Sequence, residues 1–569
     1  MSRLDAHFSF EPRILKFGTS GRRGLVRDMP QVEVYINALA EIEYLKSLPL
    51  SEGGIVAGDE FYFASDLRPS STAYMEAFGG NGELAQAICR AIADAGMRPV
   101  FLGFIPTPAL TLYAIERQKG SIMVTGSHIP FDRNGYKTNT SRGELLKKHE
   151  QPIGEYVAAV RERIYGAEYE HALFDASGRF KTGSAKLPEV IAEARTAYMA
   201  RYVDFFGAGA LAGLRLVAYQ HSAVGRDLLV DVLQQLGAEV IAAGRSDSFV
   251  PIDTENIEDA LLADLDAMVR SVATRYGPVD ALVSTDGDSD RPLVLGVRAD
   301  GSAQFFSGDR LGMVVAEYLG VDGVVVPISC NDAIDRSALA AVLEPKTRIG
   351  SPFVIAGMEA ALAAGKQKVC GWEANGGFLT ASTLMRDGRK LAPLPTRDAL
   401  LPVVASLVAA NEKRVPLTDL FHALPARYGR AALLKNFPRA EALRIMEAYT
   451  PAVPGVVTLQ ANTAEPQAFD CQNGRLPIDP AVTAAIGAML AELAKYFPVS
   501  RGFTAIESIN YTDGVRISFT NGDVAHLRPS GNADELRVYA TADTEARAAA
   551  IAAYGIEDPD GLLRSLARG

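Results

Sequence analysis

One pattern, a helix followed by a glycine and a strand, occurs three times along this chain and limits the folds open to it. The first copy has apolar residues at helical spacing over 84–92, then Gly96 and an apolar segment over 99–102. The second copy covers 225–241 and the third covers 311–326. A short apolar strand after each helix is typical of α/β units. The sequence therefore predicts three similar α/β domains with mixed, mainly parallel sheets.

The last part of the chain has a different pattern. Residues 514–519 alternate between apolar and polar side chains, as a strand does, and Asn521-Gly522 is a hairpin-type turn. Residues 524–527 are expected to pair with the strand at 514–519, and residues 535–539 to form the next strand of the sheet. This region is therefore predicted to be an α+β domain with an antiparallel sheet.

The length and charge of the chain narrow its organisation and its partners. A chain of 569 residues is too long for one hydrophobic core. We therefore expect four domains, over 1–205, 206–308, 309–425 and 426–569. The formal net charge of −11 provides no general basic surface for nucleic acid or an anionic membrane. An anionic ligand must be held by local clusters of basic residues.

The cysteines and the apolar segments indicate a cytoplasmic protein. Cys89, Cys330, Cys370 and Cys471 lie far apart, without the spacing of a metal or redox site, which fits reduced and buried thiols. The N-terminal residues contain no apolar segment of signal-peptide length, and no run approaches ~20 apolar residues. We expect neither secretion nor a membrane span.

A serine loop follows the apolar segment at 121–124. Gly126 and Pro130 predict a tight loop that presents Ser127 at the end of a strand. His128 is adjacent to this serine and Lys137 stands ten residues later, so both could share or move a proton. Taken alone, the Ser-His pair fits a hydrogen-bonded turn at least as well as a nucleophile.

Three carboxylates, those of Asp286, Asp288 and Asp290, stand at alternate positions in a loop between two apolar strands. Their charges repel one another unless a hard cation lies among them. The loop is not an EF-hand, since its sixth position is Arg291 rather than glycine. Three oxygen ligands leave room for a phosphate oxygen or water, the arrangement that Mg²⁺ prefers. A solvated acidic turn is the alternative.

Two further loops near the start and the end of the chain suit an anion. Residues 16–24 alternate glycines with hydroxyl side chains and end in two arginines, the second of which is Arg23. Such a loop lets backbone N–H groups and a guanidinium approach an oxyanion, although a flexible turn explains it equally well. Residues 528–532 combine an arginine, a hydroxyl, a glycine and an amide, which makes a compact phosphate cradle.

A glycine-rich loop over 370–378 contains the single tryptophan, Trp372, together with Glu373 and Asn375. A carboxylate and an amide in a fixed loop can each bridge the vicinal hydroxyls of a sugar. An ordinary turn is the alternative for these residues alone.

Four of these loops, in this order, resemble those of the α-D-phosphohexomutase family, which includes phosphomannomutases and phosphoglucomutases. Residues 125–130 resemble its T-A-S-H-N-P phosphoserine loop, and 286–291 its D-G-D-x-D-R metal loop. Residues 373–376 stand in the place of its sugar-selecting loop, and 528–532 in that of its R-x-S-G-T phosphate loop. The similarity covers nearly the whole chain and is greatest to bacterial phosphomannomutases.

The resemblance implies an isomerase with four domains around a central cleft. Ser127 would carry a phosphoryl group and convert mannose 1-phosphate and mannose 6-phosphate into each other through a hexose 1,6-bisphosphate, which also acts as activator. Mg²⁺ would be the metal cofactor. The residues implied are Ser127, His128, Lys137 and Arg23 for catalysis, Ser127, Asp286, Asp288 and Asp290 for the metal, and Arg291, Glu373, Asn375, Arg528, Ser530, Gly531 and Asn532 for the substrate.

Departures from the family pattern leave alternatives open. Gly126 and Ile129 replace the usual alanine and asparagine, Asn532 replaces a threonine, and a second acid/base group is unassigned. A phosphoglucomutase or an enzyme of dual specificity is the nearest alternative. A non-catalytic sugar-phosphate-binding protein and a phosphatase that hydrolyses its phosphoserine are more distant ones. A small-molecule hexose phosphate is the expected partner, and the protein is expected to be a monomer or a homodimer.

Overall fold

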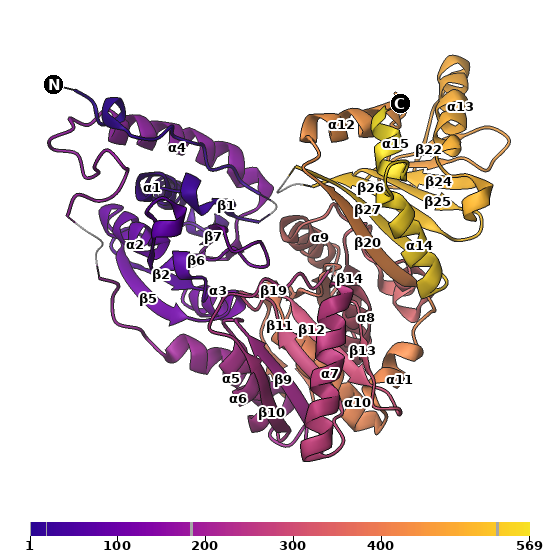
Figure 1. Cartoon of the computed structure of the whole chain (residues 1–569), viewed down its shortest axis with the longest axis horizontal. Helices are drawn as coiled ribbons and strands as arrows, with labels where there is room; N and C mark the ends of the chain where they lie inside the picture. Colours follow the sequence, from indigo (N-terminus) through magenta and orange to yellow (C-terminus); the bar gives the residue numbers. More distant parts are fainter. Residues whose placement is uncertain (1, 19, 183–185, 256, 531–533, 569) are drawn as a thin grey trace. The chain divides into compact units, whose positions relative to one another are not determined.

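The computed structural model (Figure 1) describes residues 2–18, 20–182, 186–255, 257–530 and 534–568. The chain forms two compact units. The first comprises Met1–Asp322 and Ser351–Phe421, and the second comprises Gly323–Gly350 and His422–Gly569. The four predicted domains divide the chain more finely, and their boundaries stay a prediction.

The first sheet of unit 1 carries the serine loop. Its order is β1 (Arg22–Leu25), β7 (Arg133–Thr140), β6 (Ser121–Val124), β2 (Glu60–Ser65) and β5 (Arg98–Phe104), with β8 (Gly143–Glu144) beside β7. β2 runs parallel to β5 and β6, whereas β7 is antiparallel to β6 and β1. The helices around it are α1 (Gln31–Ser47), α2 (Leu84–Asp94), α3 (Thr107–Glu116) and α4 (Glu150–Tyr165), and β3 (Tyr74–Met75) pairs with β4 (Asn81–Gly82).

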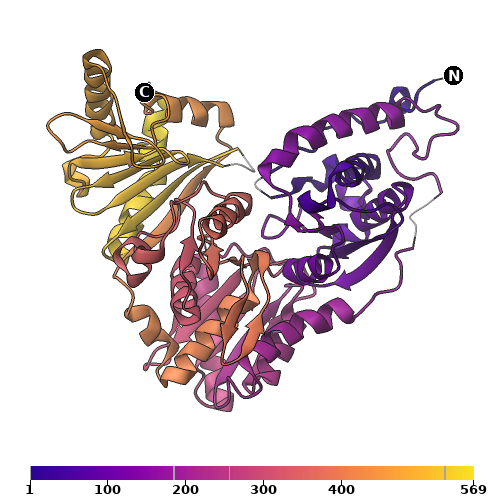
Figure 2. The ribbon, with the colours of Figure 1, turned by 180° about the vertical axis from the view of Figure 1, so that it is seen from behind.

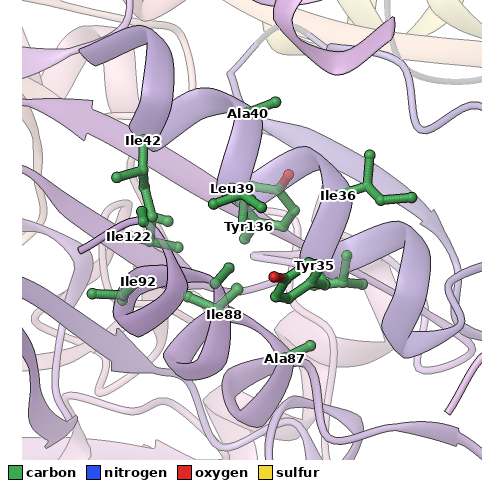
Figure 3. Packing of buried hydrophobic residues seen from close by; sticks show 14 of the residues in the cluster. Tyr35, Ile36, Leu39, Ala40, Ile42, Ala87, Ile88, Ile92, Ile122 and Tyr136 are labelled. Atoms are coloured by element: carbon green, nitrogen blue, oxygen red, sulfur yellow. The ribbon is translucent and has the colours of Figure 1, made fainter. Parts of the chain in front are cut away.

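Helices α1 and α2 enclose a large core, in which Figure 3 shows side chains of both helices beside those of the sheet. The predicted apolar stripe of α2 is confirmed, because Ile88 and Ile92 are fully buried. They belong to one cluster with Leu39 of α1 and with Ile122 and Tyr136 of strands β6 and β7. The core therefore anchors the strands on both sides of the serine loop.

The second sheet of unit 1 carries the acidic loop. Its order is β10 (Glu239–Arg245), β9 (Arg215–His221), β11 (Ala281–Thr285), β12 (Pro292–Val297) and β13 (Ala303–Phe305). The helices α5 (Glu193–Phe206), α6 (Arg226–Gln235) and α7 (Asp259–Tyr276) belong to this part of the chain. β9 runs parallel to β10 and β11, while β11 and β12 are antiparallel. Residues 286–291 are therefore the short connection between two paired strands.

The third group of strands in unit 1 carries the predicted sugar loop. β15 (Val369–Trp372), β16 (Phe378–Thr380) and β19 (Leu394–Asp398) pair in this order, and β17 (Leu384–Arg386) pairs with β18 (Arg389–Leu391). The helices are α8 (Gly308–Leu319), α9 (Ser351–Ala363), α10 (Leu400–Lys413) and α11 (Leu417–His422). These three strand pairs are antiparallel, so they form the antiparallel part of the mixed sheets that were predicted. Short hairpin links replace the helical crossovers that parallel strands need.

Unit 2 contains an antiparallel eight-stranded sheet, as predicted for the end of the chain. Its order is β20 (Tyr428–Lys435), β27 (Glu535–Ala542), β26 (Val524–Pro529), β25 (Val515–Phe519), β24 (Ile506–Asn510), β21 (Thr458–Gln460), β22 (Gln467–Phe469) and β23 (Arg475–Leu476). Its helices are α12 (Arg439–Ala448), α13 (Pro480–Lys495), α14 (Glu545–Ile556) and α15 (Leu562–Arg568), and β14 (Gly323–Val325) also belongs to this unit. Figures 1 and 2 both show α14 lying along β20 and β27.

Two smaller predictions are tested by the same structure. Cys89, Cys330 and Cys370 are buried, but Cys471 is exposed because it lies in a turn after β22, so that prediction is wrong for this residue. Within the described ranges, no helix combines the length and the apolar character needed to cross a membrane.

Candidate active site

Ser127 follows strand β6 and has an unusual backbone conformation. Its φ is +56°, in the left-handed region that a residue with a side chain seldom adopts. Its N–H donates to Thr125 Oγ1 at 2.7 Å, and the residue is fully buried. Its Oγ donates to Asp286 Oδ2 at 2.8 Å, and His128 Nδ1 lies 3.3 Å from the same Oγ. The serine loop and the acidic loop, 159 positions apart in the chain, therefore meet at the serine hydroxyl.

Asp286, Asp288 and Asp290 lie together in the connection between β11 and β12. All three are buried, and one carboxylate oxygen from each lies within 4.8 Å of the others. Burial and the two neighbouring carboxylates raise the pKa of Asp286 well above its usual range. The arrangement predicted from alternate sequence positions is therefore present as a compact group of oxygen atoms.

This group fits a hard divalent cation such as Mg²⁺. Asp288 Oδ1 and Asp290 Oδ1 are buried and have no hydrogen-bond donor among the described residues. Buried carboxylate oxygens without a donor are costly unless a cation compensates them. Carboxylate and hydroxyl oxygens are the hard ligands that a cation such as Mg²⁺ takes. A metal would therefore satisfy the atoms that the protein leaves without partners.

Lys137 of β7 also compensates the acidic group. Its Nζ donates to Asp288 Oδ2 and to Asp290 Oδ2, each at 2.7 Å. Thr107 at the start of α3 donates to Asp288 Oδ2 at 2.5 Å as well. Burial raises the pKa of Asp290, but Arg397 and Lys137 outweigh this effect and hold that pKa well below its usual range. Lys137 therefore lies against the metal loop, and its catalytic role stays a prediction.

Arg397 of β19, a residue that sequence reasoning missed, links the metal loop to the predicted sugar loop. Its Nε and Nη2 donate to Asp290 Oδ2 at 3.0 and 2.8 Å, and its Nη1 donates to Glu373 Oε2 at 2.9 Å. All three residues are buried. The following residue, Asp398, accepts hydrogen bonds from two tyrosines of α5, which fixes the end of the strand. The guanidinium of Arg397 therefore bridges Glu373 and the metal loop.

Arg23 and Arg291 add positive charge at the same place. Arg291 Nη1 lies 3.6 Å from Asp253 Oδ1, and its Nε lies 3.7 Å from Asp290 Oδ1. Burial and the charge of Arg291 lower the pKa of Arg23 to about 10. Arg22, the other arginine of the first glycine loop, instead pairs with Glu41 in the core, because alternate residues of β1 face opposite sides.

The other predicted loop residues have mixed outcomes. Asn375 Oδ1 accepts from the Gly377 N–H at 3.0 Å, so this oxygen helps to hold the loop itself. Trp372 was expected in the loop, but it ends strand β15, where it is buried and stacks on Phe378 with 5.8 Å between ring centroids. A side chain with this much apolar surface stabilises the protein more when it is buried in the core than when it is exposed in a loop.

The predicted phosphate cradle lies in unit 2. Arg528 Nε is 3.1 Å from Asp513 Oδ1, and the Ser530 N–H donates to the Glu535 carbonyl at 2.9 Å. Gly531 and Asn532 lie outside the described residues. The structure thus brings Ser127, His128, Lys137, the three aspartates, Arg291 and Glu373 together in unit 1, and places Arg528 and Ser530 in unit 2.

Comparisons with known proteins identify the family and the fold of this chain. Family models described as phosphoglucomutase/phosphomannomutase match residues 15–163 (alpha/beta/alpha domain I), 307–428 (alpha/beta/alpha domain III) and 479–556 (C-terminal domain). A solved phosphoglucomutase/phosphomannomutase family protein from Burkholderia thailandensis superposes with a TM-score of 0.62 at 16% identity, over 95% of each chain. This likeness shows that the fold is shared.

Two proteins of known sequence are similar along almost their full length. A phosphomannomutase from Sinorhizobium fredii is 35% identical over 97% of this chain and 98% of its own. A phosphomannomutase from Salmonella muenchen is 34% identical over 93% of this chain and 92% of its own. The chain therefore belongs to the phosphoglucomutase/phosphomannomutase family and is a phosphohexomutase, an isomerase of hexose phosphates.

Proposed function

We propose that this phosphohexomutase is a phosphomannomutase, which interconverts mannose 1-phosphate and mannose 6-phosphate through a phosphoserine at Ser127. The observation that carries the proposal is the 2.8 Å contact between Ser127 Oγ and Asp286 Oδ2, at the edge of three buried carboxylates. A protein that only binds sugar phosphates needs neither a buried nucleophile nor a metal site beside it. The names of the two relatives at 35% and 34% identity support mannose as the sugar.

In this proposal Asp286, Asp288, Asp290 and the phosphoryl oxygen on Ser127 would hold Mg²⁺, which would supply positive charge to the transferring phosphoryl group. Arg23 and Arg291 lie beside the same carboxylates and offset the negative charge that develops on the phosphoryl oxygens. The protein thus surrounds the reacting phosphorus with fixed charges in a buried site, where they act more strongly than in water.

The transfer also requires one proton to move. When the phosphoryl group passes to the sugar, the bond from phosphorus to Ser127 Oγ breaks and a bond to the sugar oxygen forms. The hydroxyl proton of the sugar must then reach Ser127 Oγ. Lys137, which donates to two metal-loop carboxylates, is our candidate for passing this proton on, and His128, with Nδ1 3.3 Å from Oγ, would assist it. The second transfer, from the hexose 1,6-bisphosphate back to Ser127, reverses these steps.

Two loops would bind the rest of the substrate. Glu373, fixed by Arg397, presents a carboxylate suited to vicinal hydroxyls, and the amide of Asn375 is two residues away. Arg528, Ser530, Gly531 and Asn532 would bind the phosphate that does not react. Hexose 1,6-bisphosphate would restore the phosphoserine whenever it is lost.

Glucose is the second candidate sugar. Mannose and glucose differ only in the configuration of one hydroxyl, and the matching family models are described as phosphoglucomutase and phosphomannomutase together. The charges that act on phosphorus would serve either sugar. The choice between the two sugars therefore depends on the groups around that one hydroxyl.

The experiment that tests the proposal compares both sugar pairs. Interconversion of the 1- and 6-phosphates of mannose and of glucose is followed with Mg²⁺ and a trace of hexose 1,6-bisphosphate, for the wild type and for Ser127→Ala. We expect faster turnover of the mannose pair and none in the variant. Faster turnover of glucose would assign the enzyme as a phosphoglucomutase, and release of inorganic phosphate alone would identify a phosphatase. No turnover by the folded, phosphorylated protein would reject both sugars.

A further inference from the structure

Arg68 is a buried cation next to Ser127 that the proposed chemistry does not use. It lies just after strand β2 and is 1% exposed. Its Nη1 donates to the carbonyl oxygens of Pro130 and Arg133, at 2.6 and 2.8 Å. Its Nη2 donates to those of Ser127 and Ile129, at 3.2 and 2.9 Å. One guanidinium therefore holds four carbonyl groups of the serine loop.

The surroundings of Arg68 keep it in this position. One face of the guanidinium lies over the ring of Phe249, 3.9 Å from its centroid, a contact that stabilises a cation. Asp66 Oδ2 is 3.9 Å from Nε and compensates the charge. The planar guanidinium offers several donors in fixed directions, which no other side chain does. Arg68 is therefore suited to fix the shape of a loop.

Asp66 also fixes the other side of Ser127. It accepts from Thr125 Oγ1 at 2.7 Å, and Thr125 Oγ1 accepts from the Ser127 N–H at 2.7 Å. The N–H of Ser127 is thus held through Thr125, and its carbonyl is held by Arg68. Both backbone groups of a residue with φ of +56° are therefore restrained, which is what a strained conformation needs in order to persist.

The glycine before the serine makes room for this arrangement. A Cβ at position 126 would lie 2.8 Å from both Cζ and Nε of Arg68, closer than a side chain tolerates. An alanine, the usual residue at this place in the family, would therefore push the guanidinium away. Gly126 and Arg68 are consequently coupled: the small residue is required because the large one occupies the space.

From these contacts we infer that Arg68 is a positioning residue for phosphoryl transfer, which holds Ser127 so that its Oγ points at Asp286. This inference rests on the proposed function of Ser127. Gly126, which leaves room for the guanidinium, and Thr125, which accepts from the Ser127 N–H, contribute to the same positioning. A misplaced nucleophile binds substrate as before but reacts slowly, so the loss should be in kcat and not in KM.

The first test replaces Arg68 and measures kcat and KM separately. We expect Arg68→Met to lower kcat about 100-fold with KM changed less than twofold, the size of effect that a displacement of ~1 Å produces. Arg117→Met is the matched control, since Arg117 also lies over a ring, that of Tyr113, and donates to a carbonyl, but at the surface. It should keep wild-type kcat.

Thr125 provides a second variant pair if Arg68→Met fails to fold. Thr125→Val keeps the shape and removes the hydroxyl, whereas Thr125→Ser keeps the hydroxyl. We expect kcat of Thr125→Val to be at least tenfold below that of the wild type, and kcat of Thr125→Ser to stay close to the wild-type value. Equal kcat in both variants, or a loss that appears in KM alone, would overturn the inference.

Coupling and structure distinguish this inference from the proposed function. Gly126→Ala should lower kcat at least tenfold in the wild type but less than twofold in the Arg68→Met background, because the clash is then absent. Equal losses in both backgrounds would contradict the coupling. Crystal structures of the folded variants give a readout that needs no turnover: Ser127 should leave the left-handed region, and its Oγ should leave Asp286. An inactive wild type would reject the proposed function, while an unchanged Ser127 in these structures would reject the role of Arg68.

Discussion

The buried arginine that joins the metal loop to the sugar loop gives the sharpest prediction of stability. Arg397 donates to Asp290 Oδ2 at 3.0 and 2.8 Å and to Glu373 Oε2 at 2.9 Å, and about 3% of its side chain is exposed. We consider Arg397→Met, which keeps most of the apolar stem and removes the charge. The substitution leaves the cavity nearly filled, so its effect comes from the two carboxylates.

The expected cost follows from those two carboxylates. Removing one partner of a buried ion pair costs about 3–5 kcal/mol, because an uncompensated charge stays in a medium of low polarity. Asp290 keeps Lys137 at 2.7 Å, so most of the cost falls on Glu373. We expect a loss of about 3 kcal/mol at neutral pH.

Trp372 provides the assay, because it is the single tryptophan of the chain and precedes Glu373. Its fluorescence in urea reports unfolding at this site, compared between the wild type, Arg397→Met and a control, Arg386→Met. Arg386 pairs with Glu412 at the surface, so its replacement should cost less than about 1 kcal/mol. The double variant Arg397→Met, Glu373→Gln should recover most of the lost stability. Equal urea midpoints for Arg397→Met and Arg386→Met would refute the reasoning.

Three further predictions concern stabilisation by metal binding, the loss of stability in acid, and a buried arginine of unit 2. Mg²⁺ at 100 times its Kd should stabilise the wild type by about 2.7 kcal/mol, and thermal melting should show no such gain in Asp286→Asn. Burial lowers the pKa of His526 to about 4, below its unfolded value of about 6.5. Between these two pH values the folded state binds fewer protons than the unfolded state, so the free energy of unfolding falls as the pH drops from 6.5 to 4. The urea midpoint of His526→Asn should therefore depend less on pH in this range than that of the wild type. Arg427 donates to Asp332 and Asp543, each at 2.7–2.8 Å, so Arg427→Met should cost about 3 kcal/mol, measured as faster hydrogen exchange of β20.

The elements that could be predicted are those with a strong local pattern. The apolar stripe of α2 and the alternation in β25 are signals that neighbouring residues carry by themselves, and the structure confirms both. Asp286, Asp288 and Asp290 also give a local signal, because three charges in one short loop repel one another, and their carboxylate oxygens lie together in the structure. Strand direction was harder to predict, since it depends on whether a connection crosses over or turns back, and the helix-strand pattern does not distinguish these cases.

The residues that sequence reasoning missed act over long distances. Arg68 and Arg397 are single arginines whose side-chain hydrogen-bond acceptors lie more than 20 positions away, and no local motif marks them. A weak signal existed for Arg397, because Arg397-Asp398 directly precedes the long apolar segment 399–410, and a charged pair beside a buried helix must find partners inside the protein. Nothing in the sequence distinguishes Arg68 from the other arginines, since its acceptors are backbone carbonyls.

The approach of the serine loop to the metal loop explains why glycine stands in both. A Cβ on Gly287 would lie 2.7 Å from the Ser127 carbonyl oxygen, so the two loops meet backbone to backbone. Only at this distance can the short side chain of Ser127 reach Asp286. Such a close approach brings a polar backbone into a buried place, and its carbonyl needs a donor there. Arg68 supplies this donor, and Gly126 leaves room for its guanidinium. The two glycines, the left-handed Ser127 and the buried Arg68 therefore depend on one another, and replacing any one of them should displace the Ser127 hydroxyl.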